Sequence, residues 1–307
     1  MKVSVVMAVY NAAGSVGRMI ESLLNQSLSD LEVILVDDGS TDGSAEICDG
    51  YVSRDHRVKV IHKANEGVSS ARQTGLDTAV GEYVIHADAD DYVEAGMLEQ
   101  LYRKAKEEDA DVVFCDYFID DLDGNITIRR QQPPFDASQT LRAMFDRLYG
   151  SCWNKLVRRS CFDKYGICFP VGLNYCEDLL IWAQLFQHPE IRISYVNRAF
   201  YHYVANPNSV TRGGSHTMLE NIRLFTSRMA EVLPVGDPDI DAYVAKLPIA
   251  PFLYAFLNRL VSGKESRKEY KKLRKVVWND TDSLRWKLGY LCMDFNLMFL
   301  ARKLIKL

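Results

Sequence analysis

Residues 31–44 of the chain read LEVILVDDGSTDGS. An apolar run ends at Val36, two aspartates and a Gly-Ser turn follow, and a helical pattern begins at Ser44. A solid apolar run is typical of a strand that helices cover on both faces. In an open parallel sheet, ligands bind beyond the carboxyl ends of the strands. The stretch therefore predicts a buried strand whose carboxyl end opens into a polar, ligand-binding loop.

The same alternation of strand and helix extends over the first 115 residues. This pattern predicts an α/β domain built on a mostly parallel, Rossmann-like sheet. The predicted strands are Val3–Val9, Leu31–Val36, Val58–Ile61, Tyr83–Ile85 and Val112–Cys115, and the predicted helices are Ala13–Leu24, Ser44–Val52, Val68–Ala79 and Ala95–Glu107.

The regular alternation stops after residue 115. Asp120–Pro134 contains an Asp-Gly turn signal and predicts a hairpin. Beyond Gly213-Gly214 the pattern is helical to the end, so we expect two domains, 1–215 and a helical C-terminal region 216–307. The remaining predicted elements are helices over Ser138–Tyr149, Asp178–Gln187 and Ser283–Leu307 and strands over Ile191–Val196 and Phe200–Tyr203.

The composition is that of a globular protein with an uneven charge. Of 307 residues, 48% are hydrophobic and 25% charged, which excludes a disordered or collagen-like chain. The net charge is −4. This charge argues against general nucleic-acid binding, because such binding needs a basic surface. From Pro251 onward, however, 13 Lys and Arg stand against five Asp and Glu, a net +8 that leaves −12 for the first 250 residues. An acidic body with a basic tail indicates that the tail meets something anionic.

The seven cysteines form no CxxC pair and no His-rich cluster. Their odd number indicates the reduced thiols of a cytoplasmic protein rather than a disulfide framework or a zinc site. The apolar run at the N-terminus ends at Asn11, too early for a signal peptide or a membrane span. Because the chain has no stretch of about 18 uncharged apolar residues, we expect no transmembrane helix.

Acidic residues gather after two of the predicted strands, at Asp37-Asp38 and at Asp88, Asp90 and Asp91. Clustered carboxylates repel one another, and a divalent cation removes that cost. Mg²⁺ and Mn²⁺ prefer such oxygens and complete their shell with water and phosphate. The alternative is a pair of helix N-caps, where aspartate is favourable. Two clusters at successive strand ends favour a metal–diphosphate site.

Two common nucleotide-binding motifs are absent. The first strand is followed by YNAAG instead of GxGxxG, and the chain contains no GxxxxGK[ST] loop. This argues against a hydride-transfer enzyme and a P-loop NTPase. Phosphates must then be held by metal and side chains.

Four segments together resemble a known family. VSVVMAVYNAAGSV, VILVDDGSTDGS, NEGVSSARQTGL and YVIHADADD follow one another with the order and spacing of a family 2 glycosyltransferase with the GT-A fold. The resemblance continues through CWNKLVRR, Glu177-Asp178 and YHYVANPNSVT and covers residues 1–212. One departure is Gln73, where the family commonly has Asn after Arg.

The resemblance implies an inverting, metal-dependent transferase that takes its sugar from a nucleotide-diphosphate donor, most often a uridine diphosphate sugar. Mn²⁺ or Mg²⁺ is the implied cofactor, and the implied acceptor is a saccharide or lipid-linked hydroxyl in surface polysaccharide or glycolipid synthesis. The implied donor-binding residues are Val9, Tyr10, Asp38, Asn65, Gly67, Arg72, Asp88 and Lys155, the implied metal ligands are Asp90, Asp88 and His202, and the implied catalytic pair is Glu177 and Asp178.

Within this set, Asp178 is the candidate base, because a sugar hydroxyl needs a proton acceptor within about 3 Å to attack at neutral pH. Several assignments have a structural alternative. Glu177 and Asp178 could simply cap the helix that they begin. Lys155 could be a surface helix charge, and His202 a hydrogen-bonded structural histidine. Trp153 could stack on an acceptor sugar or belong to the core. Arg212 is a further candidate cation, and Asn206–Thr211 resembles a lid over the donor.

The C-terminal stretch Ser283–Leu307 is apolar with basic residues at both ends. One helix is expected here, with Trp286, Tyr290, Met293, Leu297 and Leu300 along one side. Such a helix can lie on an anionic membrane, here the inner face of the cell membrane, or pack on its own domain or a second subunit. Two other functions stay open from the residues alone: a sugar-phosphate nucleotidyltransferase, which would need a Gly-rich basic loop, and a nucleotide-sugar-binding protein without turnover.

Overall fold

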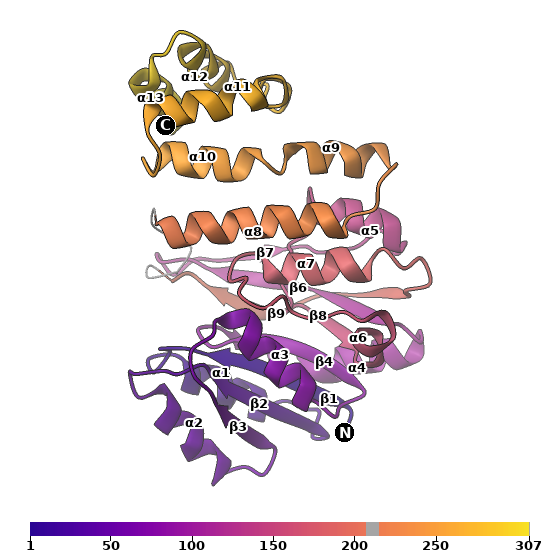
Figure 1. Ribbon diagram of the computed structural model, residues 1–307. Coiled ribbons are helices and arrows are strands. Elements are labelled where there is room, and N and C mark those ends of the chain that lie inside the picture. The colour runs from indigo at the N-terminus through magenta and orange to yellow at the C-terminus, as the bar shows by residue number, and fades with distance from the viewer. Residues whose placement is uncertain (207–214, 307) are drawn as a thin grey trace. The chain divides into compact units, whose positions relative to one another are not determined.

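The computed structural model describes residues 1–206 and 215–306 (Figure 1). The chain forms two compact units, Met1–Pro207 and Asn208–Leu307. The division falls a few residues before the boundary at 215 that the helical pattern predicts.

Unit 1 is built on one nine-stranded mixed sheet. The strand order is β3-β2-β1-β4-β8-β6-β9-β5, with β7 paired to the side of β6. Strands β1 to β4 run parallel to one another, whereas β8 is antiparallel to both β4 and β6. The strands are β1 Val3–Val9, β2 Leu31–Asp37, β3 Val58–His62, β4 Tyr83–Asp88, β5 Tyr92–Val93, β6 Val112–Asp120, β7 Ile126–Arg129, β8 Lys155–Arg158 and β9 Ile193–Val204.

Helices cover both faces of β1, β2 and β4, which is why these strands are buried along almost their whole length. In β1, Val5 and Met7 point into the large core cluster shared with helix α1, Val16–Leu24. On the other face, helix α3, Val68–Thr78, approaches so closely that a Cβ on Gly75 would fall 2.3 Å from Val6 Cγ1. The other helices of unit 1 are α2 Ser44–Val52, α4 Met97–Glu107, α5 Ala137–Met144, α6 Ser160–Tyr165 and α7 Glu177–Leu185.

The second half of unit 1 differs most from the sequence prediction. Strands β5 and β8 and helix α6 are short, and the apolar pattern did not predict them. The two strands predicted over 191–203 are one strand, β9, whose register on β6 shifts next to Asp116. The predicted hairpin is confirmed: β6 and β7 are antiparallel, and Gly124 takes a positive φ of 82° in the turn.

Unit 2 is helical in its described part. Its helices are α8 His216–Val232, α9 Pro238–Lys246, α10 Ile249–Leu257, α11 Gly263–Asn279, α12 Leu284–Asp294 and α13 Met298–Lys306. Phe256, Tyr270, Tyr290 and Met293 form the centre of a core cluster built from α10, α11, α12 and α13.

The prediction of one helix over 283–307 is wrong, because α12 ends at Asp294 and α13 begins at Met298. Asn296, between the two helices, has a positive φ of 61°, which asparagine tolerates better than most residues. The chain folds back so that Gly289 contacts Ile305; a Cβ on Gly289 would lie 2.6 Å from Ile305 Cγ1. Tyr290 and Met293 therefore point inward, while Leu297 and Leu300 stay exposed.

Residues 238–257 are long and apolar enough to cross a membrane, judged by length and composition alone. About a third of them are buried inside the protein. Asp239, Asp241 and Lys246 interrupt the apolar run in these residues, and the structure divides them into the helices α9 and α10. A buried helix of a water-soluble protein meets the same test, and Phe252 and Phe256 of α10 do lie in the unit 2 core.

Candidate active site

The acidic loops meet at one edge of the parallel sheet. Val9, the last residue of β1, pairs with Asp37 of β2, and on its other side Ala8 pairs with Asp88 of β4. All three strands point the same way, so their polar carboxyl ends lie next to one another. Residues separated by some fifty positions in the sequence, Asp37 and Asp88, thus share one edge.

Asp38 organises the loop that follows β3. Its buried carboxylate accepts hydrogen bonds from the backbone N–H groups of Glu66, at 3.0 Å, and Gly67, at 2.7 Å. Lys63 Nζ lies 3.5 Å from Asp38 Oδ1. A carboxylate has about four acceptor positions, so capacity for a ligand donor remains. Asn65, in the same loop, is exposed.

Gly67 can be only a glycine in this loop. Its φ is +93° with ψ 166°, a region that L side chains avoid. A Cβ here would also fall 2.1 Å from Asn174 Oδ1. The Asn65–Gly67 loop is therefore in contact with the segment that leads into α7, the helix that carries Glu177 and Asp178.

The end of β1 is tied to the loop that follows β2. Val9 is buried, and its carbonyl accepts the Asp38 N–H at 2.9 Å. Asn11, with a positive φ of 49°, accepts the Thr41 N–H on its side-chain oxygen at 2.8 Å. Between them Tyr10 is 52% exposed, so its ring is open to a flat ligand at this edge.

Arg72 joins the two acidic motifs. Its buried guanidinium donates to Asp88 Oδ1 at 2.8 Å and to Glu177 Oε1. Burial alone would lower the pKa of Arg72, but the two carboxylates raise it, so the group stays charged. One side chain of α3 thus holds the end of β4 against the first turn of α7.

Asp178 is half-buried beside this ion pair, in the first turn of α7. Burial, followed by the charge of Glu177, raises its pKa to about 7. Cys176, just before the helix, has a positive φ of 51° and turns the chain into it. A carboxylate of this pKa can take up a proton near neutral pH, as a general base must.

The acidic turn after β4 is held from two sides. The Tyr201 hydroxyl accepts the Asp88 N–H at 3.0 Å, and Asn206 Nδ2 donates to Asp90 Oδ2 at 3.0 Å. Arg18 of α1 donates to the Asp90 carbonyl. Burial raises the pKa of Asp90, and burial together with Asp88 raises that of Asp91. The turn therefore concentrates negative charge that nearby cations do not balance in full.

A divalent cation fits this turn only in part. Within residues 1–206 and 215–306, no three His, Cys, Asp or Glu side chains are grouped to hold a metal ion. Mg²⁺ and Mn²⁺ usually take one or two carboxylates and fill the remaining positions with water and phosphate oxygens. Asp88 and Asp90 are of the right chemistry for such a shared site, with ligands also coming from a diphosphate.

Lys155 does not reach the surface. It lies on β8, and its Nζ donates to the carbonyls of Tyr149, at 2.8 Å, and Ser151, at 2.7 Å, and to Asn154 Oδ1 at 2.6 Å. Burial lowers the pKa of Lys155 to about 7. The surface-helix reading is wrong, and a fully buried amine cannot touch a donor in this structure, so its role is to hold the 149–154 segment.

His202 and Trp153 are also enclosed. Both ring nitrogens of His202 are engaged, with Asp120 at 3.0 Å and Glu94 at 3.1 Å, which leaves none for a metal. Trp153 is buried and stacks on Tyr201 with ring centroids 4.3 Å apart. His202 is therefore a hydrogen-bonded structural histidine, and Trp153 belongs to the core. Arg212 and the lid at 206–211, apart from Asn206, lie outside the described residues.

The sequence did not point to several contacts that position these groups. Gln73, the departure from the family pattern, accepts the Phe169 N–H at 2.8 Å, and Ser69 donates to the Leu173 carbonyl. Both bonds join α3 to the segment before α7. No local pattern marks such pairs, because the partners are about a hundred positions apart.

The chain is similar to known proteins over almost its whole length. The model of the family described as Glycosyl transferase family 2 matches residues 4–166. The chain is 44% identical to glycosyltransferase GlyG of Streptococcus pneumoniae, over 98% of this chain and 97% of that one. It is 35% identical to the uncharacterized glycosyltransferase EpsJ of Bacillus subtilis, over 91% of this chain and 84% of that one.

Solved structures show the same fold. S. aureus TarS 1–349 in complex with UDP-GlcNAc matches with a TM-score of 0.69 at 21% identity, over 99% of this chain and 90% of that one. The same fragment in complex with UDP matches with a TM-score of 0.66. The predicted GT-A architecture with C-terminal helices is confirmed.

Proposed function

This chain belongs to glycosyltransferase family 2, and we propose that it transfers a sugar, with inversion, from a uridine diphosphate sugar to an acceptor hydroxyl. That it is a glycosyltransferase follows from its family. One observation carries the finer proposal. Arg72 binds Asp88 and Glu177 at once and so brings the two acidic motifs and Asp178 into one place.

The donor nucleoside would lie along the edge formed by β1, β2 and the Asn65–Gly67 loop. Tyr10 offers an exposed ring to the base, and Asp38 retains acceptor capacity for a base N–H. The UDP-GlcNAc and UDP complexes of the similar TarS fragment support a uridine nucleotide. Lys155 and His202 are left out of this proposal, because neither has a free polar atom at the surface.

The reaction is a displacement at the anomeric carbon. The acceptor oxygen attacks from the face opposite the leaving diphosphate, the new C–O bond forms, and the bond to the diphosphate breaks. Asp178 takes the proton of the acceptor hydroxyl, and its raised pKa of about 7 suits that task near neutral pH. Glu177, fixed by Arg72, would keep the first turn of α7 and hence Asp178 in position.

A divalent cation, when bound, would neutralise charge that develops on the diphosphate. Asp90 and Asp88 would hold it. Isothermal titration calorimetry with a UDP-sugar tests this part. We expect Asp90→Ala to lose the increase in donor affinity that Mn²⁺ gives to the unchanged protein. Asp123→Ala, on the exposed hairpin turn, is a matched control that should keep this increase.

The activity itself is tested by incubating the full chain with a panel of UDP-sugars, Mn²⁺ and simple glycoside acceptors. We expect release of UDP and a product whose anomeric configuration, read by NMR, is opposite to that of the donor. A product with the donor's configuration would contradict inversion. In a second assay with a sugar 1-phosphate and UTP, formation of a UDP-sugar with release of diphosphate would contradict the proposal and indicate a nucleotidyltransferase.

The acceptor would be a saccharide or lipid-linked hydroxyl of a surface polysaccharide or glycolipid, and the compartment the cytoplasm. All seven cysteines are free thiols, in keeping with a reducing compartment. Fractionation of cells that produce the full chain tests the compartment.

A further inference from the structure

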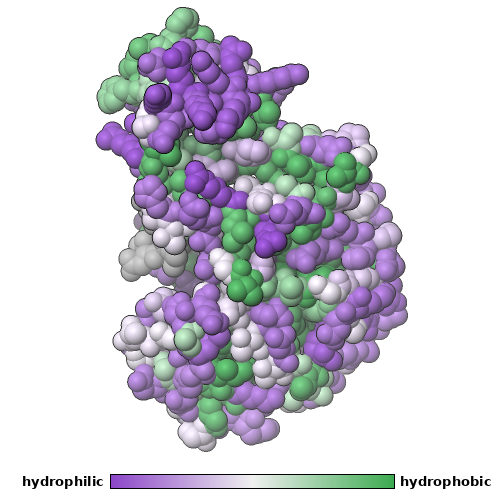
Figure 2. All heavy atoms as spheres, in the orientation of Figure 1, coloured by the Kyte–Doolittle hydropathy of each residue, from purple (hydrophilic) through white to green (hydrophobic). Residues whose placement is uncertain are grey.

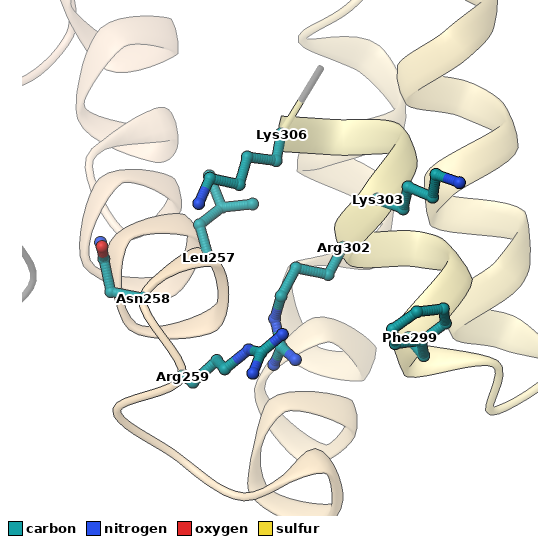
Figure 3. A pocket seen from close by; sticks show the side chains of 7 residues that line it. All are labelled: Leu257, Asn258, Arg259, Phe299, Arg302, Lys303 and Lys306. Atoms are coloured by element: carbon teal, nitrogen blue, oxygen red, sulfur yellow. The ribbon is translucent and has the colours of Figure 1, made fainter.

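Unit 2 contains a pocket of about 390 Å³ lined by cations (Figure 3). It lies between the end of α10 and one side of α13. Figure 3 shows the guanidinium groups of Arg259 and Arg302 turned toward each other, with Lys303 and Lys306 farther along α13. The other lining residues are Leu257, Asn258 and Phe299, so no carboxylate of residues 1–206 and 215–306 lines the pocket.

The cations of this pocket have no acidic partner within the described residues, although many other cations of unit 2 do. Arg274 pairs with Asp294 at 2.9 Å, and Lys246 pairs with Asp280 at 3.0 Å. Arg302, by contrast, donates to the Phe256 carbonyl, at 2.7 Å, and to no carboxylate of the described residues. Burial, and then the charge of Arg259, lowers the pKa of Arg302. Gathered like charges of this kind are stabilised by an anion from outside.

Exposed apolar side chains accompany the cations. Phe299, which lines the pocket, is 70% exposed, and Phe295, between α12 and α13, is equally exposed. Along α12 the exposed residues Leu284, Leu288 and Leu291 precede Phe295 at helical spacing, so they share one face. Figure 2 shows green, apolar atoms over this end of unit 2 beside purple, hydrophilic ones.

We propose that the cationic pocket and the apolar stripe of α12 and α13 form a docking surface for a bilayer that contains anionic phospholipids. The cations would bind lipid phosphates, and Phe295 and Phe299 would enter the acyl boundary. Charge complementarity supports this occupant, because residues 251–307 carry a net +8. Nucleic acid would satisfy the cations but leave the leucines of α12 without a contact.

Vesicle flotation with the full chain tests the proposal. We expect binding to vesicles of phosphatidylglycerol and phosphatidylcholine, none to pure phosphatidylcholine, and a loss of binding at high salt. Neutralising the pocket with Arg259→Gln, Lys303→Gln and Lys306→Gln should weaken binding on the order of 100-fold, since each cation near an anionic surface contributes about one factor of five. Free glycerol phosphate should not compete at the same phosphate concentration, because it lacks the apolar part.

Matched variants separate this surface from diffuse attraction. Lys264→Gln, Lys268→Gln and Lys271→Gln remove the same charge from exposed positions of α11, outside the pocket, and should weaken binding far less. Phe295→Ser with Phe299→Ser should abolish binding, whereas Val235→Ser, at a 93% exposed position of unit 2, should not. Circular dichroism checks that each variant is folded.

Three results would overturn the proposal. One is failure of the unchanged protein to bind the anionic vesicles. Another is an equal loss of binding in the α11 variant. The third is self-association, seen by analytical ultracentrifugation, that Phe295→Ser with Phe299→Ser abolishes while vesicles are ignored; the surface would then join two copies of the chain. UDP release in solution should be unchanged in all these variants, so the outcome is independent of the proposed reaction.

Discussion

Two groups of charged side chains, one in each unit, are balanced in opposite ways. In unit 1 the buried Arg72 lies between Asp88 and Glu177, so its charge is matched inside the protein. In unit 2 the cations around Arg259 and Arg302 line an open pocket without a carboxylate. In the first group the cation already has its partners inside the protein, whereas in the second the cations are left to an external anion.

The difference indicates different consequences of substitution. A buried charge that loses its partner costs far more than the pair contributed, because the remaining charge stays desolvated. An exposed cation without a partner can be removed at almost no cost to folding. Changes in the unit 1 group should therefore alter stability and turnover, and changes in the unit 2 group should alter association only.

The largest effect is expected at Asp178. Asp178→Asn removes the proposed base, and loss of general base catalysis typically costs about 10²–10⁴-fold in rate. We expect kcat to fall by that range while the donor affinity, measured by calorimetry, stays near that of the unchanged protein. Turnover close to the original rate would show that Asp178 is not the base. Asp163→Asn, on the exposed side of α6, serves as a control.

A large loss of stability is expected from Arg72→Met, because it leaves the carboxylates of Asp88 and Glu177 without their cation. Breaking a buried pair costs about 3–5 kcal/mol. Urea unfolding followed by hydrogen exchange in β1 and β4 measures the effect within unit 1. Arg54→Met is the matched control, since the Arg54–Glu21 pair at 3.1 Å is exposed and should contribute below about 1 kcal/mol. An equal loss of stability in the two variants would show that the buried pairs of Arg72 stabilise unit 1 no more than an exposed pair does.

Gly67→Ala should destabilise the protein less than Arg72→Met does, and its effect should be confined to the Asn65–Gly67 loop. The positive φ and the contact with Asn174 both oppose a side chain, at a cost of about 1–3 kcal/mol. We expect weaker donor binding by calorimetry, because the loop that rests on Asp38 must shift. Gly124→Ala, at a similar φ of 82° but with open space around its Cβ, should leave donor binding unchanged.

The pH dependence of turnover follows from the raised pKa of Asp178, about 7. Only the deprotonated carboxylate can accept the proton, so kcat should rise about tenfold per pH unit below 7 and level off above it. A pH series from about 5.5 to 8.5 with saturating donor measures this. The residual activity of Asp178→Asn should lack this limb; a flat profile for the unchanged protein would contradict the assignment.

The smallest effect is expected in unit 2. Each of three substitutions, Arg259→Gln, Lys303→Gln and Lys306→Gln, should change the free energy of unfolding of unit 2 by less than about 0.5 kcal/mol. The reason is that none of these cations has an ion-pair partner in the described chain. Denaturation followed by the fluorescence of Trp278 and Trp286 checks this. A clear destabilisation would mean that these cations are balanced within the protein after all.

Local patterns were enough to predict the parallel half of unit 1. Val3–Val9 and Leu31–Asp37 are mostly apolar and buried because α1 and α3 lie on opposite faces, and acidic residues stand where these strands end. The short strands β5 and β8 carry no such periodicity. Their pairing depends on β9 and β6, which are remote in the sequence.

The candidate site was predicted in its composition and less well in its contacts. Asp88 and Asp90 stand out by residue type at the end of a strand, whereas Glu177 and Asp178 were assigned through the family resemblance. Burial does not stand out in this way, and it is burial that removes Lys155 and His202 from the proposed site: both are polar, but their polar atoms are used inside the fold. The break at Asn296 was missed for a related reason, since apolar residues continue across it.

The bridge made by Arg72 also has an evolutionary consequence. A substitution of Asp88 or Glu177 alone would leave the guanidinium half-matched, and a substitution of Arg72 alone would leave both carboxylates so. We therefore expect a single substitution at any of the three positions to be selected against, although they lie in three separate stretches of the sequence. In related chains, substitutions are expected to be more frequent in the exposed β6–β7 turn than at these three positions.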